Sequence, residues 1–378
     1  MIIYGAIIIP IIAALILWKF YKHEIVWWEI LVPMGASLLL IIVSKLIIET
    51  VQVRSEEYWG SIVKETHYYE PWNEYIHRTC TRKVGKTTQT YDCSYVQYHP
   101  AQYDVTTTSG EYIGIDKAEY LKLKSRFGNS SFVDMHRRYH TKDGDMYKSL
   151  WDGSKENSVP ATTTHSYENR VKAADASVFH FKKVTEKHIK DFNLQEYPKI
   201  TEYFNMNAII GDDNIPDVAS ANKRLKYMNG KLGPTKEVSM FVVVFKNQPI
   251  DASFYQESYW EGVNMNEIVV CIGINDLREV QWARVISWTH NEGLKIDIRR
   301  IVEDQEKLNL CELIDKSYPL IENGFVRRDF HEFDYLTVNP PTWAVILTYL
   351  LTIGLNVGIS CWVASNEHSE TNNKRWRN

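Results

Sequence analysis

The sequence predicts a membrane-anchored α+β protein, in which three transmembrane helices flank an extracytoplasmic domain. Three observations predict this fold. Uncharged apolar stretches lie near both ends of the chain, a strand-like block rich in Tyr, Thr and Val follows the second stretch, and buried strands then alternate with helices. The expected parts are two transmembrane helices with a short basic linker (1–48), a β-rich region (49–188), an α/β region (189–340), a transmembrane helix (341–365) and a polar cytoplasmic tail (366–378).

The apolar stretches run over Ile2–Trp18, Val26–Ser44 and Thr342–Ala364, and Glu29 is the one charged residue inside them. A hydrocarbon core of about 30 Å needs about 20 helical residues, so each stretch is close to the required length. A cleaved signal peptide would need basic residues before the first stretch, and none precedes Ile7. We therefore expect three spans, with tryptophans near their ends in the headgroup layer.

Basic residues predict the orientation of these spans. Lys19, Lys22 and His23 stand in the linker between the first two spans, and further basic residues stand in the tail. Two spans separate linker from tail, so both lie on one side of the membrane. The positive-inside rule makes that side cytoplasmic, which places the region between the second and third spans outside the cytoplasm.

Cys80 and Cys93 flank a short hairpin pattern with Gly85 in its turn. Cysteines that face each other across such strands can form a disulfide in an oxidising compartment, and two free thiols are the alternative. We expect Cys271 in the core, and Cys361 belongs to the third span. The cysteine spacings contain no four-ligand zinc pattern.

Composition and motifs argue against nucleic acid and nucleotide as partners. The formal charge is −4, whereas nucleic-acid binding usually requires a basic face. Gly85-Lys86-Thr87 resembles the end of a phosphate-binding loop, but Cys80 occupies the position where that motif needs its first glycine. The many aromatic residues (23 Tyr and 12 Trp) are better explained by sheet packing than by sugar binding.

In the β-rich region, Asp143-Gly144 between two strand-like runs predicts an antiparallel hairpin, and Val171–Phe181 is a further strand candidate. In the α/β region, the order strand, helix, strand predicts a right-handed βαβ unit with parallel strands. Its expected elements are a helix over Val218–Tyr227 that ends at Asn229-Gly230, strands over Val238–Phe245, Glu267–Ile274 and Trp282–Thr289, and helices over Ala252–Trp260 and Leu294–Leu310.

The run that ends at Phe245 is followed by Tyr259-Trp260-Glu261-Gly262-Val263-Asn264-Met265-Asn266 and then by a second buried strand. Over residues 238–310 this order resembles the TPM-type domain of membrane-tethered extracytoplasmic proteins, in which a helix ends in an aromatic-Gly loop before such a strand. The resemblance implies a tethered domain outside the cytoplasm. Some members of that family use an acidic loop for metal or phosphatase chemistry. This chain has no clear counterpart of the loop, because Asp212, Asp213 and Asp217 lie upstream and do not align with it.

His136 and His140 are candidate metal ligands, together with Asp134, because the three residues would share one face of a strand. The protease pattern is not met, since Arg137 stands where a glutamate is needed. A third histidine, such as His99 or His165, would have to complete the site. The alternative is a solvated or hydrogen-bonded strand face, and we favour it.

These observations predict an integral membrane protein that presents an extracytoplasmic binding or structural domain to a protein or envelope partner. The lipid bilayer is the other expected partner, and no cofactor is expected unless a metal ion binds His136 and His140. The alternative is a membrane-tethered hydrolase or metal-dependent enzyme with its site in that domain. No catalytic motif supports the alternative, so we favour the binding domain.

Overall fold

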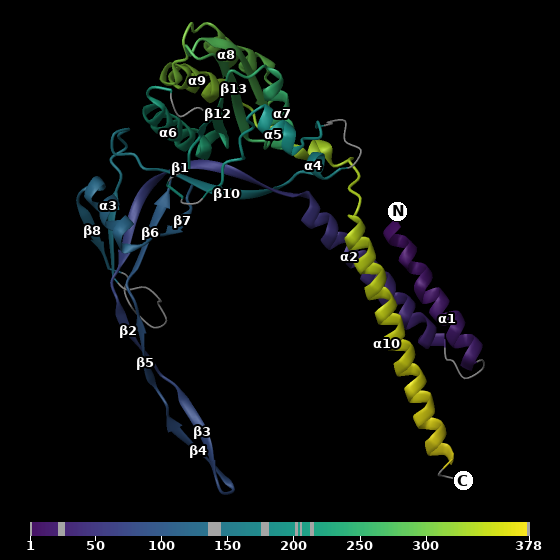
Figure 1. Ribbon diagram of the computed structural model, residues 1–378. Helices are drawn as coiled ribbons and strands as arrows, with labels where there is room; N and C mark the ends of the chain where they lie inside the picture. The colour runs from purple at the N-terminus through teal and green to yellow at the C-terminus, as the bar shows by residue number, and fades with distance from the viewer. Residues whose placement is uncertain are drawn as a thin grey trace. The chain divides into compact units, whose positions relative to one another are not determined.

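The computed structural model describes residues 2–21, 27–134, 145–174, 181–200, 203–204, 206–211 and 215–375. The chain divides into two compact units, which Figure 1 shows. We call Met1–Ser55, Ser166–His180 and Asp329–Asn378 the helical unit. We call Glu56–His165 and Phe181–Arg328 the head unit. The division shows that segments far apart in the sequence build each unit.

The helical unit contains a 3₁₀ helix (Ile2–Ile7) and the helices α1 (Ile8–Tyr21), α2 (Trp27–Val53) and α10 (Thr342–Arg375). Within the described residues, Ile30–Val53 and Thr342–Trp362 are long and apolar enough to cross a membrane. With 24 and 21 residues, they span roughly 36 and 32 Å at the helical rise. The first apolar stretch forms a shorter helical segment, Ile3–Lys19. The second helix extends to Val53, beyond the predicted end at Ser44.

Polar and aromatic contacts join α2 and α10. The Asn356 amide nitrogen donates to the Ser37 hydroxyl at 2.8 Å, and both side chains are buried. At one end of the pair, the rings of Trp28 and Trp362 lie 6.4 Å apart. At the other end, the Gln52 side chain donates to the Asn339 carbonyl at 3.1 Å. The start of α2 and the end of the apolar part of α10 therefore lie at the same end of the pair.

A short helix, α4 (Arg170–Ala173), overlaps the beginning of the segment predicted as a strand over Val171–Phe181. The strand prediction is wrong where the segment forms α4. Asn169 caps this helix, because its side-chain oxygen accepts a hydrogen bond from the Lys172 amide at 3.0 Å. Residues 175–180 of the segment lie outside the described residues. The guanidinium of Arg170 forms an ion pair with Glu49 at 2.9 Å, and this pair connects α4 to α2.

The β-rich part of the head unit contains an antiparallel sheet in the order β7-β6-β1-β9-β8, with β10 also paired to β1. The predicted antiparallel region is therefore confirmed, although Asp143-Gly144 lies outside the described residues. Val63, Val105 and Leu123 belong to the small hydrophobic core of this part. The elements are β1 (Arg54–Tyr69), β6 (Gln102–Thr107), β7 (Tyr112–Gly114), α3 (Lys117–Phe127), β8 (Ser130–Val133), β9 (Met146–Leu150) and β10 (Pro160–Glu168).

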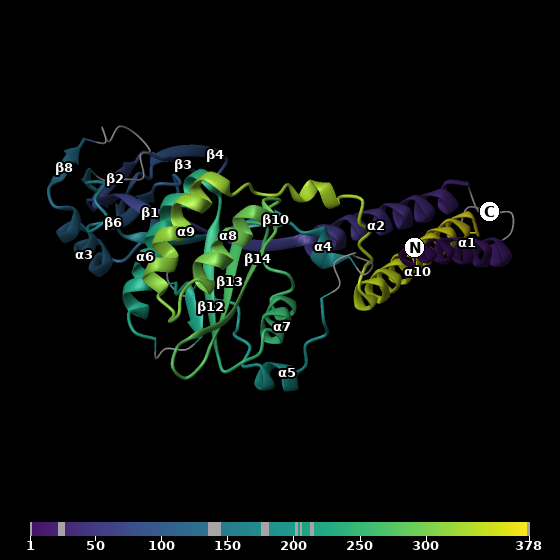
Figure 2. The same cartoon turned by 90° about the horizontal axis from the view of Figure 1, so that it is seen from above.

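The α/β part holds a four-stranded sheet in the order β11-β12-β13-β14. Strands β12 and β13 pair in parallel with α7 between them in sequence, as predicted, and β14 pairs antiparallel with β13. In Figure 2, α8 and α9 lie on one side of this sheet and α7 on the other. The elements are α5 (Glu186–Asp191), β11 (Ile209–Gly211), α6 (Val218–Lys236), β12 (Ser239–Lys246), α7 (Asp251–Tyr259), β13 (Glu267–Ile274), β14 (Val280–Ser287), α8 (Glu292–Glu303) and α9 (Leu310–Gly324).

The single helix predicted over Leu294–Leu310 is wrong in its extent. Helix α8 ends at Glu303, and Leu310 begins α9. Asn309 separates the two helices, because its side-chain oxygen accepts a hydrogen bond from the Glu312 amide at 3.0 Å and so caps a new helix.

Helix α6 continues through Asn229-Gly230, where the sequence predicted its end. The glycines serve a different purpose here, because they let β1 pack directly on the helix backbone. A Cβ at Gly233 would lie 1.9 Å from the Gly60 carbonyl oxygen, and one at Gly230 would lie 2.7 Å from the Ser61 carbonyl oxygen. The Asn229 side chain is also buried, and its amide exchanges two 2.9 Å hydrogen bonds with the backbone of Met240 in β12. Helix α6 thus joins the two parts of the head unit.

Candidate interaction arm

Between β1 and β6 the chain forms a long two-stranded ribbon, residues 72–99, which we call the arm. Its inner ribbon pairs β2 (Trp72–Ile76) with β5 (Tyr95–His99), and its outer ribbon pairs β3 (Thr79–Val84) with β4 (Thr87–Asp92). Figure 1 shows these strands running out from the antiparallel sheet of the head unit. Every residue of β4 is exposed, so neither of its faces is covered by the described chain.

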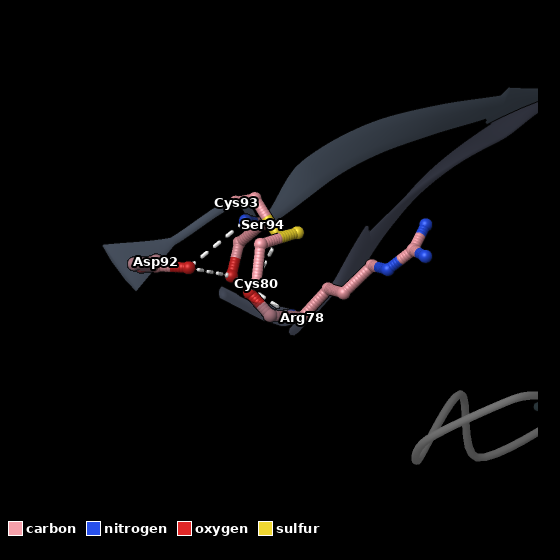
Figure 3. Close-up of a disulfide and its surroundings, with 5 residues drawn as sticks. All are labelled: Arg78, Cys80, Asp92, Cys93 and Ser94. Atoms are coloured by element: carbon pink, nitrogen blue, oxygen red, sulfur yellow. Dashed lines mark hydrogen bonds between the residues drawn. A yellow bond between two sulfur atoms is a disulfide. The ribbon is translucent and has the colours of Figure 1, made fainter. Parts of the chain in front are cut away.

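The predicted disulfide is confirmed. Cys80 and Cys93 are bonded where the inner ribbon meets the outer one, with their Cα atoms 5.8 Å apart (Figure 3). Around it, the Cys93 amide donates to the Arg78 carbonyl at 2.9 Å, and the Arg78 amide donates to the Ser94 hydroxyl at 3.1 Å. The Ser94 hydroxyl and amide also hold the pKa of Asp92 below its usual range. These bonds connect the strands where the ladder of β3 and β4 begins.

A two-stranded ribbon without a covering layer is at best marginally stable in water. A disulfide offsets this by restricting the unfolded chain, and a loop of this size is stabilised by about 3 kcal/mol in the chain-entropy model. The Cys80–Cys93 bond therefore explains how an arm with so little buried surface keeps its shape. Gly85 has φ of 66°, and Gly85-Lys86 forms the hairpin turn between β3 and β4.

The base of the arm is held by an aromatic stack. The rings of Trp72 and His99 lie 4.8 Å apart and nearly parallel. The His99 Nε2 atom also lies 2.8 Å from a carboxylate oxygen of Glu74. On the antiparallel sheet, the rings of Tyr68 in β1 and Tyr103 in β6 stack with their centres 5.2 Å apart. Stacked aromatic rings are thus present both on the sheet and at the base of the arm.

The surface of the arm combines exposed aromatic rings with positive charge. Tyr98 is 63 % exposed and Tyr75 is 54 % exposed. Between residues 78 and 92 four basic side chains stand against a single carboxylate, whereas the whole chain carries −4. Tyrosine and arginine are enriched where proteins bind one another. The aromatic and basic side chains of the arm are Tyr75, Tyr91, Tyr95, Tyr98, Arg78, Arg82, Lys83 and Lys86.

Replacing Cys80 and Cys93 with serine should loosen the outer ribbon without unfolding the head unit. Loss of about 3 kcal/mol of chain-entropy stabilisation would raise amide hydrogen exchange over residues 79–92, while exchange in β12 and β13 stays unchanged. Hydrogen exchange followed by mass spectrometry measures both regions at once. Cys311→Ser serves as the control, because Cys311 is a free thiol. Unchanged exchange in the outer ribbon of the double variant would contradict this role of the disulfide.

The predicted metal ligands His136 and His140 lie outside the described residues, and Asp134 is an exposed residue just after β8. The two histidines proposed to complete the site already have partners. His99 contacts Glu74, and His165 stacks on Trp59 at 4.0 Å and lies 2.9 Å from Glu111. Within the described part of the chain, no group of three or more His, Cys, Asp or Glu residues could hold a metal ion. The metal site stays a prediction.

Among the acidic residues considered for the loop of TPM-type domains, Asp212 and Asp213 lie outside the described residues. Asp217 precedes α6 with φ of 65° and does not cap the helix with its side chain. This leaves Asp217 without a described role.

The head unit also contains buried carboxylates that the sequence did not single out. Glu57 is 1 % exposed, and its Oε1 atom accepts hydrogen bonds from the Arg327 guanidinium and, at 2.6 Å, from the Trp59 indole. Arg327 also lies 3.3 Å from Glu237. Burial raises the pKa of Glu57 above its ordinary value, although the positive charge of Arg327 opposes this shift. The pair links β1 to the segment after α9.

A second buried carboxylate, Glu267, begins β13. The Tyr197 hydroxyl donates to it, and the Asn264 amide and side chain donate at 2.9 and 2.8 Å. Burial raises the pKa of Glu267, and burial beside this carboxylate raises the pKa of Tyr197 well above its ordinary value. The donors around Glu267 come from the protein itself, so this carboxylate is part of a buried hydrogen-bond network.

No family model, curated protein or solved structure matches the chain. The resemblance of residues 238–310 to TPM-type domains therefore stays a prediction.

Proposed function

We propose that this chain is an integral membrane protein that presents its head unit outside the cytoplasm and binds a protein or envelope partner through the arm. The arm is the observation that carries the proposal. It is a long exposed ribbon, stabilised by the Cys80–Cys93 disulfide and rich in tyrosine and basic side chains. The arm contributes little to a hydrophobic core, because it buries almost no apolar surface.

The helical unit supports membrane anchoring. Two of its helices are long and apolar enough to span, and in our proposal the first apolar stretch is a third span. Packing supports the third span, because a Cβ at Gly5 would lie 2.3 Å from the Tyr349 hydroxyl of α10. Ile3 and Ala6 are likewise buried. A close approach through a small residue is typical of helices that associate in a bilayer.

Two observations support an extracytoplasmic head unit. Disulfides persist in oxidising compartments, which matches the Cys80–Cys93 bond. The Trp28–Trp362 contact places the start of α2 and the end of the apolar part of α10 at one end of the pair, and basic residues flank both positions in the sequence. The positive-inside rule assigns that end to the cytoplasm.

The chemistry of the arm favours a protein partner with an acidic, partly apolar surface. Exposed tyrosines supply large contact area at low entropic cost, and arginines can pair with carboxylates in a fixed geometry. Arg82 already lies over the ring of Tyr91 at 5.7 Å, so aromatic and charged groups form one surface on the outer ribbon. A partner of opposite charge would be attracted to this surface before contact.

A photoreactive phenylalanine at Tyr98 should crosslink to a discrete partner in the native membrane, because Tyr98 is 63 % exposed on the arm. Adding Arg82→Glu and Lys83→Glu should reduce the yield of that adduct roughly tenfold, since the electrostatic attraction is reversed. Crosslinked bands resolved by electrophoresis and identified by mass spectrometry measure this result.

The matched control places the same photoreactive residue at Leu121, which is 51 % exposed on α3 of the head unit. The proposal expects no discrete adduct there. Absence of an adduct from Tyr98, or the same adduct from both positions, would contradict a binding role of the arm.

A further inference from the structure

The head unit contains a basic cleft of about 310 Å³ that is separate from the arm. One wall is the loop that leads into β10, with Lys155 and Ser158. The other wall is the N-terminal half of α6, with Ser220, Lys223 and Tyr227. The volume is at the lower end of the range for small-molecule sites.

The loop wall is held rigid by its own hydrogen bonds. The Asp152 carboxylate accepts from the Ser154 amide at 2.8 Å and from the Asn157 side chain at 2.7 Å. The Trp151 indole donates to the Ser154 carbonyl at 2.9 Å, and the Ser158 hydroxyl donates to the Lys155 carbonyl at 2.6 Å. A loop with this many internal bonds keeps its shape before a ligand arrives, which lowers the entropic cost of binding.

Cation–π contacts connect the loop to α6. The Lys155 ammonium lies 5.4 Å from the centre of the Tyr227 ring. The Lys231 ammonium lies 5.9 Å from the centre of the Trp151 ring. The Arg126 guanidinium of α3 also donates to the Glu156 carbonyl at 2.8 Å. These contacts connect the loop to α6 and to α3.

Basic side chains outnumber acidic ones in the lining of the cleft. Lys155, Lys223 and Arg224 line it, and Glu156 is the one carboxylate among its described lining residues. Arg224 pairs with Asp315 of α9, whereas Lys223 is exposed and has no partner in the described part of the chain. Ser220 belongs to the first turn of α6, where the helix dipole adds partial positive charge.

We propose that this cleft binds a small phosphate monoester. Its phosphate would lie between Lys155 and Lys223, with the Ser220 hydroxyl as a neutral donor, because Arg224 already pairs with Asp315. Its organic group would pack on Pro160, in the less polar part of the lining. A dianion with three exposed oxygens matches several cations and a helix N-terminus better than a single carboxylate does.

The test uses the full chain in detergent micelles and titrates it with glucose 6-phosphate, with glucose as the control ligand. Calorimetry should show binding of the phosphate ester only, and Lys223→Glu should weaken it at least about tenfold, because a cation is replaced by an anion. Lys187→Glu, the same change at an exposed position of α5, should leave it unaltered. An unchanged melting temperature of Lys223→Glu shows that the variant is folded.

A second set of titrations distinguishes a soluble ester from a lipid headgroup. Nanodiscs that contain phosphatidic acid present the same phosphate chemistry on a bilayer, and loss of their binding in Lys223→Glu would assign the cleft to a headgroup. Absence of phosphate-dependent binding in both settings, or equal weakening by Lys187→Glu, would overturn the proposal. The outcome does not depend on whether the arm binds a partner.

Discussion

Replacing Arg327 with methionine should lower the free energy of unfolding of the head unit by about 3–5 kcal/mol, the cost of leaving a buried charge without its partner. The loss arises at Glu57, which is 1 % exposed and accepts a hydrogen bond from the Arg327 guanidinium. Its second oxygen has no hydrogen-bond partner in the described residues, so the carboxylate depends on the bonds at Oε1. Denaturant unfolding of the full chain, followed by tryptophan fluorescence, measures the change.

The loss should depend on pH in a defined direction. Burial already raises the pKa of Glu57 above the ordinary value of 4.5, and removal of Arg327 raises it further. A carboxyl with a raised pKa in the folded state takes up a proton as the pH falls, so folding is favoured progressively from neutral pH toward about 4.5. The effect of Arg327→Met should therefore be smaller at pH 5 than at pH 8.

The control for this prediction is the double variant Glu57→Gln/Arg327→Met, which removes both charges. It should recover most of the stability that Arg327→Met loses, because no uncompensated charge remains buried. A double variant no more stable than Arg327→Met, or a loss independent of pH, would contradict the assigned role of this pair.

Gly233→Val should destabilise the head unit by about 3 kcal/mol, the upper range for overpacking a core. The Cβ position at Gly233 lies 1.9 Å from the Gly60 carbonyl oxygen, so any side chain forces β1 away from α6. Helix propensity alone would favour the substitution, since glycine is the poorest helix former after proline. A destabilised variant therefore reports packing and not propensity.

Thr235→Val, on the exposed face of the same helix, is the matched control and should change stability by less than about 0.5 kcal/mol. Thermal unfolding of the full chain in detergent compares the two variants. Equal stability of both would show that β1 and α6 do not pack through their backbones.

Patterns in short stretches of the sequence were sufficient to predict the buried strands β12 and β13 and the hairpin at Gly85. The continuous apolar runs of β12 and β13 identified buried strands, because strands covered on both faces carry apolar residues at every position. The Gly85 turn between Cys80 and Cys93 was equally local, so both the hairpin and its disulfide could be predicted.

Elements set by distant packing could not be predicted in this way. Asn229-Gly230 is a plausible helix end by propensity, and only contact with β1 and β12 shows why the helix continues. The same limit applies to Glu57 and Arg327, which are 270 positions apart in sequence. The basic cleft joins Lys155 to Lys223 only after α6 has packed on the antiparallel part of the head unit.

In our proposal the head unit lies outside the cytoplasm on a membrane anchor, and cysteine labelling distinguishes the two sides of the membrane. Cys311 and Cys361 are first replaced with serine, and Leu277, 66 % exposed in the turn between β13 and β14, is replaced with cysteine. A membrane-impermeant maleimide should label this cysteine in intact cells, and a cysteine added after Asn378 only once the cells are permeabilised. Labelling of the Leu277→Cys position only after permeabilisation would contradict the account.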